Sequence, residues 1–131
     1  MNKELVIKSK LENMSLVENF IDEVSISLSV VSDLYGNLLI STIEAVTNAI
    51  VHGNENNPDK LVHINVDSDE HSIKIKVADE GKGFNFDVVP DPTKPDLIEK
   101  PDGRGIFLMK NLADNVTFDK NGSIVTLTFN I

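Results

Sequence analysis

Two polar side chains in the segment 41–53, STIEAVTNAIVHG, have types and spacing that suit joint chemistry. Positions four apart share one face of a helix, so Glu44 and Asn48 are expected one turn apart on the same side. The amide oxygen of Asn48 is a hard ligand suited to Mg²⁺ beside phosphate oxygens and water. Glu44 can take a proton from an attacking hydroxyl or water next to that metal. An exposed helix face that merely carries a Glu and an Asn is the alternative, and the pair alone does not decide.

A carboxylate and two glycines follow the alternating apolar residues of 73–77. Asp79 continues the inward parity of that run, and an inward carboxylate needs hydrogen-bond donors. The exocyclic amine of adenine is such a donor, whereas guanine presents an acceptor at the same place. Gly81 and Gly83 leave room for a base or ribose to approach the backbone. The alternative is a strand end with a glycine turn, in which Asp79 turns to solvent.

A second pair of glycines, Gly103 and Gly105, flanks Arg104, the one arginine of the chain. Glycines that open a helix expose free N–H groups at the positive end of its dipole, which suits a phosphate. Arg104 can add charge-assisted hydrogen bonds. The alternative is a tight turn before a core helix. Neither glycine pair matches a P-loop, which requires G-x-x-x-x-G-K-[ST].

Composition limits the classes of partner. The chain of 131 residues has 12 Lys and Arg against 21 Asp and Glu, a net charge of −9, so a nucleic-acid or acidic-membrane surface is disfavoured. The absence of cysteine excludes disulfides and thiolate metal sites. We find no apolar h-region of a signal peptide and no apolar run of the roughly 18 residues that a membrane span needs. We therefore expect one cytoplasmic domain, 1–131, with no membrane association.

The elements that must position these residues follow from periodicity. Apolar residues at helical spacing predict helices over 14–31 and 37–52, with a break at 35–37. We expect Gly53 to end the second helix in the left-handed conformation. Alternation with period two predicts four strands, with a short further strand possible at 5–7, and Asn121-Gly122 as a hairpin turn. The predicted strands cover 62–66, 73–77, 116–118 and 125–131.

Helices first and antiparallel strands later indicate an α+β fold, a two-layer sandwich with helices on one face of a mostly antiparallel sheet. The segment 84–102 has no period and holds four of the five prolines. A long stretch of this kind inside a compact domain is typical of a functional lid.

Three segments, in this order, resemble the motifs of one ATPase superfamily. The segment 44–53, EAVTNAIVHG, resembles the N box of Bergerat-type ATPases, the superfamily of gyrase, heat-shock chaperones, sensor histidine kinases and mismatch-repair proteins. The segment 79–84, DEGKGF, resembles the first glycine box, and 103–109, GRGIFLM, resembles the second. Within the superfamily, residues 52–54, 91–95 and 103–109 are similar to the stand-alone anti-sigma-factor serine/threonine kinases of bacterial partner-switching systems.

The resemblance implies an ATP-binding α/β sandwich, usually homodimeric, that uses Mg²⁺. Carried over to this sequence, Glu44 is the implied catalytic base and Asn48 the implied Mg²⁺ ligand. Asp79 is implied to hold adenine, and residues 84–102 to form the ATP lid. The remaining implied contacts to ATP or ADP come from Gly81, Gly83, Phe84, Gly103, Arg104, Gly105 and Ile106.

Proteins of the family that the chain resembles bind a sigma factor and phosphorylate a serine or threonine on a small antagonist protein. The resemblance thus implies a serine/threonine protein kinase that regulates transcription. A different class stays open: a nucleotide-gated module that sequesters a partner without phosphotransfer. A sensor histidine kinase is disfavoured because none of the three histidines lies in a dimerising helix.

Overall fold

The computed structural model describes residues 1–81 and 101–131, and the side chains of all of these except 101–104. The helices are α1 (Met14–Ser27), α2 (Ser32–Asn48), the π-helical turn η2 (Ala49–Gly53) that continues α2, and α3 (Pro101–Leu112). The strands are β1 (Asn2–Lys8), β2 (Leu61–Ser68), β3 (Ser72–Ala78), β4 (Asn115–Asp119) and β5 (Ile124–Asn130). Two 3₁₀ turns, η1 (Leu11–Asn13) and η3 (Lys120–Gly122), precede α1 and β5.

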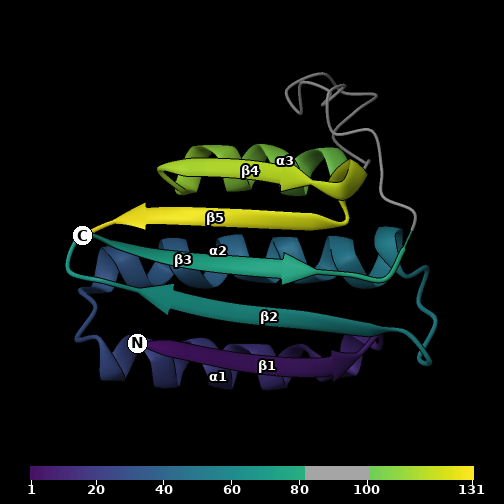
Figure 1. The fold of residues 1–131 in the computed structure, drawn as a ribbon, viewed down its shortest axis with the longest axis horizontal. Helices are drawn as coiled ribbons and strands as arrows, with labels where there is room; N and C mark the ends of the chain where they lie inside the picture. The colour runs from purple at the N-terminus through teal and green to yellow at the C-terminus, as the bar shows by residue number, and fades with distance from the viewer. Residues whose placement is uncertain (82–100) are drawn as a thin grey trace.

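The five strands form one sheet in the order β1-β2-β3-β5-β4, and every neighbouring pair is antiparallel. The three helices cover one face of the sheet and leave the other face open (Figure 1). The expected α+β class and its two-layer arrangement are thus confirmed. Strand β5, the last along the chain, lies between β3 and β4, so Val77 pairs with Val125 across the middle of the sheet.

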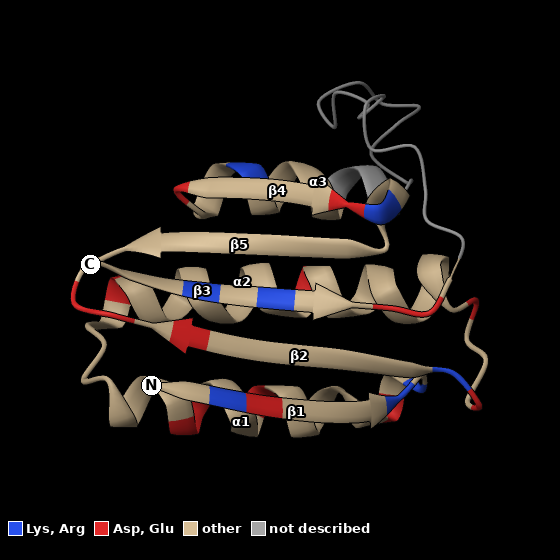
Figure 2. Ribbon diagram, in the orientation of Figure 1, with Lys and Arg blue, Asp and Glu red and all other residues tan. Residues whose placement is uncertain are grey.

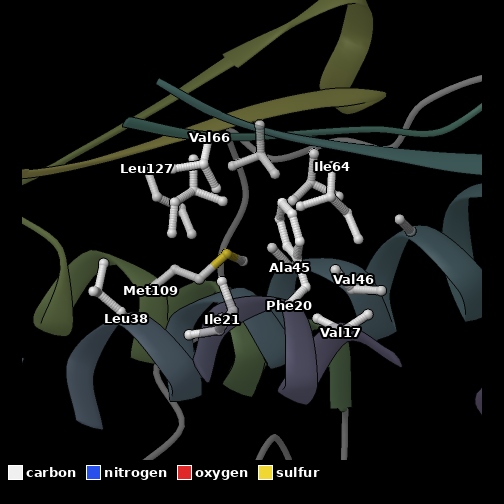
Figure 3. Packing of buried hydrophobic residues seen from close by; sticks show 14 of the residues in the cluster. Val17, Phe20, Ile21, Leu38, Ala45, Val46, Ile64, Val66, Met109 and Leu127 are labelled. Atoms are coloured by element: carbon white, nitrogen blue, oxygen red, sulfur yellow. The ribbon is translucent and has the colours of Figure 1, made fainter. Parts of the chain in front are cut away.

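The core is aliphatic and lies between the sheet and the helices. Inward residues of the strands are buried at every second position: Val62, Ile64, Val66, Ile73, Ile75, Val77, Val125, Leu127 and Phe129. Val17 and Ile21 of α1 and Leu38 and Val46 of α2 meet this layer, and the Met109 side chain reaches toward it from α3 (Figure 3). Burial of each such side chain contributes about 1.5–3 kcal/mol. Apolar residues therefore recur at the buried positions, and the strand and helix periodicities can be read from the sequence.

The junction between the first two helices lies earlier than the sequence suggests. Helix α1 ends at Ser27 and α2 begins at Ser32, so the expected break at 35–37 is wrong. The chain turns instead at Ser29, whose φ of 53° is left-handed. A glycine inside a helix costs only about 1 kcal/mol relative to alanine. The buried face of α2 outweighs that cost, and Gly36 lies within the helix.

Contrary to the expectation from the sequence, the stretch Ser32–Gly53 is long and apolar enough, by length and composition, to cross a membrane. It is the one such helix in the described part of the chain. In the fold it is a core helix: Leu38, Val46 and Ile50 are each 0% exposed and belong to the hydrophobic core. Its hydropathy therefore has a structural explanation in the packing of α2 between the sheet and its neighbouring helices.

Lys residues and Asp or Glu residues both occur along β1, β2 and β3 (Figure 2). The exposed positions of β2 and β3 include Asp67, Lys74 and Lys76. On the same face His63 Nδ1 lies 3.6 Å from Glu4 Oε1. Over the described residues the open face thus has no continuous basic stripe.

The carboxyl ends of α2 and β3 and the amino end of α3 lie at the same end of the molecule. Helix α2 and strand β3 both run toward that end, and α3 begins there, at the right of Figure 1. The described candidate residues of the three segments therefore lie at one end of the sandwich.

Candidate functional site

Glu44 and Asn48 lie against α3 at Gly105, the fifth residue of that helix. A Cβ placed on Gly105 would lie 2.9 Å from Glu44 Oε2 and 3.1 Å from Asn48 Nδ2. The two α2 side chains therefore approach the beginning of α3 closely, and residue 105 has little room for a side chain. The amino end of a helix concentrates unpaired N–H groups, so an acid, an amide and a helix terminus meet in one place.

The side chain of Asn48 is 6% exposed, and its Nδ2 has no hydrogen-bond partner among the described residues. A buried unpaired amide costs about 1–3 kcal/mol, so a group of this kind points to a ligand. Glu44 is half-buried beside it. The alternative of an ordinary exposed helix face is thus wrong for Asn48.

Asp79 follows β3 on the inward side, as its parity predicts. Its backbone N–H donates to the Ser123 carbonyl at 2.9 Å, and its Oδ1 accepts the Gly81 N–H at 2.8 Å. Burial raises the pKa of the Asp79 carboxyl above its usual value, against the opposing effects of the Gly81 N–H and the Lys60 charge. A half-buried carboxylate with one hydrogen-bond donor retains acceptor capacity for a ligand donor.

A cavity of about 10 Å³ adjoins Asp79. Its walls are Ala45 and Ala49 of the α2–η2 helix, Val77, Met109, Phe118, Gly122, Ser123 and Val125. This volume holds about one water, so entry of a purine requires the surrounding side chains to move apart. The small residues Ala45 and Ala49 and the apolar side chains around them suit the flat face of a base.

At the end of the α2–η2 helix, two positions, Gly53 and Gly81, have no room for a side chain. Residues 49–53 form a π-helical turn, in which the Asn54 N–H donates to the Ala49 carbonyl at 2.8 Å. A Cβ on Gly53 would overlap the Asp79 carboxylate, and a Cβ on Gly81 would overlap the Gly53 carbonyl oxygen. Gly53 does not have the left-handed conformation that we expected; positive φ falls on Glu55 and Asn56 instead. Its place depends on close approach to Asp79.

The second glycine box lies within α3. Gly103 and Arg104 belong to its first turn, and Gly105 begins the second. Ile106 is 3% exposed and part of the hydrophobic core. The side chain of Arg104 is outside the described residues. Gly83, Phe84 and residues 84–100 of the expected lid also lie outside them, whereas 101–102 begin α3.

Two residues of the site were assigned no contact in the sequence analysis, although Asn54 belongs to the segment 52–54 that carries the family resemblance. Ser123 holds the Asp79 backbone, and Asn54, 0% exposed, bonds to Glu80 between Asp79 and Gly81. Periodicity finds apolar faces and does not reveal a buried polar residue in a turn. The signal that could have found Asn54 is an asparagine directly after a helix-ending glycine, a place where asparagine commonly bonds to backbone.

A comparison with protein-family models matches residues 7–129 to the histidine kinase-like ATPase domain. The chain belongs to this family. Membership implies that the domain binds a nucleotide.

Curated relatives of this ATPase-family chain include two named anti-sigma F factor. That of Bacillus cytotoxicus is 44% identical over 87 residues, which cover 63% of this chain and 58% of the relative. That of Bacillus cereus is 42% identical over 87 residues, with the same coverage. The match thus spans less than two thirds of the length of these relatives.

Among solved structures, the RsbU and RsbW domains of a Mycobacterium tuberculosis protein superpose with a TM-score of 0.69. The sequence identity is 11%, and the match covers 99% of this chain and 32% of that protein. At this identity the likeness concerns the fold, which is that of the ATPase family.

Proposed function

We propose that the chain is a serine/threonine protein kinase and anti-sigma factor of a bacterial partner-switching system. The observation that carries the proposal is the close approach of Glu44 and buried Asn48, whose Nδ2 has no partner among the described residues, to α3 at Gly105. The relatives named anti-sigma F factor support a sigma factor as one partner. In the proposal, a small antagonist protein is the phosphate acceptor. We also propose that the active form is a cytoplasmic homodimer.

In this proposal ATP binds at the common end of α2, β3 and α3. The Asp79 carboxylate accepts a hydrogen bond from the exocyclic amine of adenine, and the N–H groups of the first turn of α3 hold phosphate oxygens. Glu44 accepts the proton of the acceptor hydroxyl as its oxygen bonds to the γ-phosphorus. The bond from that phosphorus to the β–γ bridging oxygen breaks, and ADP leaves.

The residues present fit one Mg²⁺ ion shared with a nucleotide. A half-turn of the Asn48 amide about χ2 exchanges the positions of its oxygen and its nitrogen, so the oxygen can face the ion from the place where Nδ2 has no described partner. The described residues contain no group of three or more His, Cys, Asp or Glu that could hold a metal without phosphate ligands. Bound Mg²⁺ would neutralise phosphate charge in an otherwise acidic domain.

The test combines the purified chain, Mg²⁺-ATP and the small antagonist protein encoded nearest to it. We expect phosphate on a serine or threonine of the antagonist, detected by mass spectrometry. Glu44→Gln is expected to lower the rate by about 10²–10⁴-fold, the range for loss of a general base, while ATP binding persists. Glu70→Gln is a matched control, since Glu70 is an exposed acid in the β2–β3 turn, at the other end of β3.

Three outcomes separate the alternatives. Equal phosphorylation by wild type and Glu44→Gln would refute the role of Glu44 as base. Lack of phosphorylation of every candidate antagonist would refute the kinase. Partner binding that depends on ATP in the absence of any phosphotransfer would establish the nucleotide-gated binding module instead.

A further inference from the structure

Asn54 is a fully buried polar residue in the turn after η2, and all of its polar side-chain atoms are paired. Its Nδ2 donates to Ser9 Oγ at 2.8 Å and to the Leu61 carbonyl at 3.0 Å, and its Oδ1 accepts the Glu80 N–H at 2.8 Å. One amide thus joins the segment after β1, the start of β2 and the end of β3. A buried network with every member paired fixes one arrangement of the backbone.

The hydrogen bond from the Glu80 N–H to Asn54 Oδ1 holds the backbone next to Asp79, the residue that lines the candidate base pocket. Glu80 stands between Asp79 and Gly81, and Gly81 donates to Asp79 Oδ1 at 2.8 Å. Two hydrogen bonds therefore hold the backbone at Asp79. The Asp79 N–H donates to the Ser123 carbonyl, and the N–H of the next residue, Glu80, donates to Asn54 Oδ1. The contact of Gly81 with the Gly53 carbonyl keeps the same segment against the end of η2.

We propose that Asn54 is a positioning residue for base recognition. By holding the Glu80 N–H it fixes the Asp79 carboxylate where that carboxylate accepts a hydrogen bond from adenine and disfavours the acceptor oxygen of guanine. Asn54 has no polar atom left for a ligand, so it acts through Glu80 and Asp79. The inference rests on the proposed function, in which Asp79 binds the base.

The experiment measures the dissociation constants of Mg²⁺-ATP and Mg²⁺-GTP for the full chain by calorimetry. Wild type is expected to prefer ATP. Asn54→Ala is expected to weaken ATP binding by about tenfold, the worth of roughly one hydrogen bond, and to change GTP binding by less than about threefold. The ATP-to-GTP preference would fall accordingly. A loss of general stability would weaken both nucleotides alike.

Two further variants separate positioning from stability. Asn54→Asp keeps an acceptor for the Glu80 N–H, so it is expected to retain most of the preference for ATP. Ser9→Ala removes the hydroxyl that accepts from Asn54 and donates to the Lys60 carbonyl at 2.8 Å, but it leaves the Glu80 contact in place. It is therefore expected to lower stability and leave the preference unchanged. If Asn54→Ala does not fold, Asn54→Ser, whose hydroxyl is too short to reach Glu80, carries the same expectation.

The outcomes distinguish this inference from the proposed function. An unchanged ATP-to-GTP ratio in Asn54→Ala, or in Asn54→Ser, overturns the positioning role alone. An equal fall of the ratio in Ser9→Ala also overturns it, because the network then acts through stability. Wild type that binds neither nucleotide, or both equally, overturns the role of Asp79 and this inference together.

Discussion

At the scale of single residues, the site depends on where side chains are missing as much as on where they are present. Gly105 borders Glu44 and Asn48, and Gly53 and Gly81 border Asp79 and each other. Each glycine allows backbone or carboxylate to come closer than a Cβ would permit. The glycine near Glu44 and the residue Asp79 therefore lead to separate predictions, one for catalysis and one for the base-binding side of the site.

Gly105→Ala is expected to impair catalysis without impairing folding. The new Cβ would lie 2.9 Å from Glu44 Oε2, so the carboxylate must move, and a misplacement of about 1 Å can cost about 10²-fold in rate. Alanine is the better helix former by about 1 kcal/mol, which offsets the crowding in the free energy of unfolding. Phosphotransfer assays and urea denaturation measure the two effects.

Gly36→Ala is the matched control for this variant. It also replaces a helical glycine, but a Cβ on Gly36 would meet nothing within 4 Å. We expect a gain of about 0.5–1 kcal/mol in stability and unchanged phosphotransfer. Equal activity of the two variants would contradict the idea that Gly105 makes room for Glu44.

Asp79→Asn is expected to change the pH dependence of stability. Burial raises the pKa of Asp79 in the folded state, so between the unfolded and folded pKa values the folded chain binds more protons. The ionised carboxylate therefore destabilises the fold at neutral pH, and this cost disappears as the pH falls through the folded pKa. The stability of Asp79→Asn relative to wild type should be greatest at neutral pH and should decrease on acidification.

Chemical denaturation of both proteins between pH 7 and pH 4 tests this expectation. A difference in unfolding free energy that does not depend on pH would show that Asp79 titrates in the native chain as it does in the unfolded one.

At the scale of elements, the sequence predicts faces better than ends. The alternation in β2, β3 and β5 and the helical spacing in α1 and α2 are visible because one side of each element is buried, and these predictions are confirmed. Helix ends depend on local conformations such as that of Ser29, for which no glycine signals the turn. The π-helical turn at 49–53 and the buried amide of Asn54 depend on tertiary contacts that a single sequence does not show.

The β4–β5 hairpin links an element to the site. Its turn was predicted from Asn121-Gly122, and it places three successive residues at positive φ, with Gly122 at 90°. The same turn positions Ser123, whose carbonyl accepts the Asp79 N–H. The geometry of a surface hairpin therefore affects the candidate base pocket.

Gly122→Ala is expected to destabilise the fold by about 1–2 kcal/mol, because a side chain at positive φ is strained. It should also weaken ATP binding, since the Ser123 carbonyl would move with the turn. Thermal denaturation and calorimetric titration with ATP measure these effects. If ATP binding were unchanged in spite of the lost stability, the hairpin would have no part in positioning Asp79.

At the scale of the whole molecule, the net charge of −9 is compatible with one nucleotide, although it disfavours a polyanion. The phosphates need to contact only the first turn of α3, where the helix dipole favours negative charge, and a metal ion would offset the acids nearby. A nucleotide bound in this way touches α2, β3 and α3 at once. Its binding should therefore stabilise the whole fold.

Mg²⁺-ATP is accordingly expected to raise the midpoint of thermal unfolding. A ligand present at about 100 times its dissociation constant adds about 2.7 kcal/mol, or about 10 °C for a domain of this size. Mg²⁺-GTP at the same concentration should give a much smaller shift, because guanine offers Asp79 an acceptor. ATP with a chelator should also give a smaller shift if Asn48 binds Mg²⁺ together with the phosphates. Equal shifts with ATP and GTP would contradict the placement of the base against Asp79, whereas equal shifts with and without Mg²⁺ would contradict the ion alone.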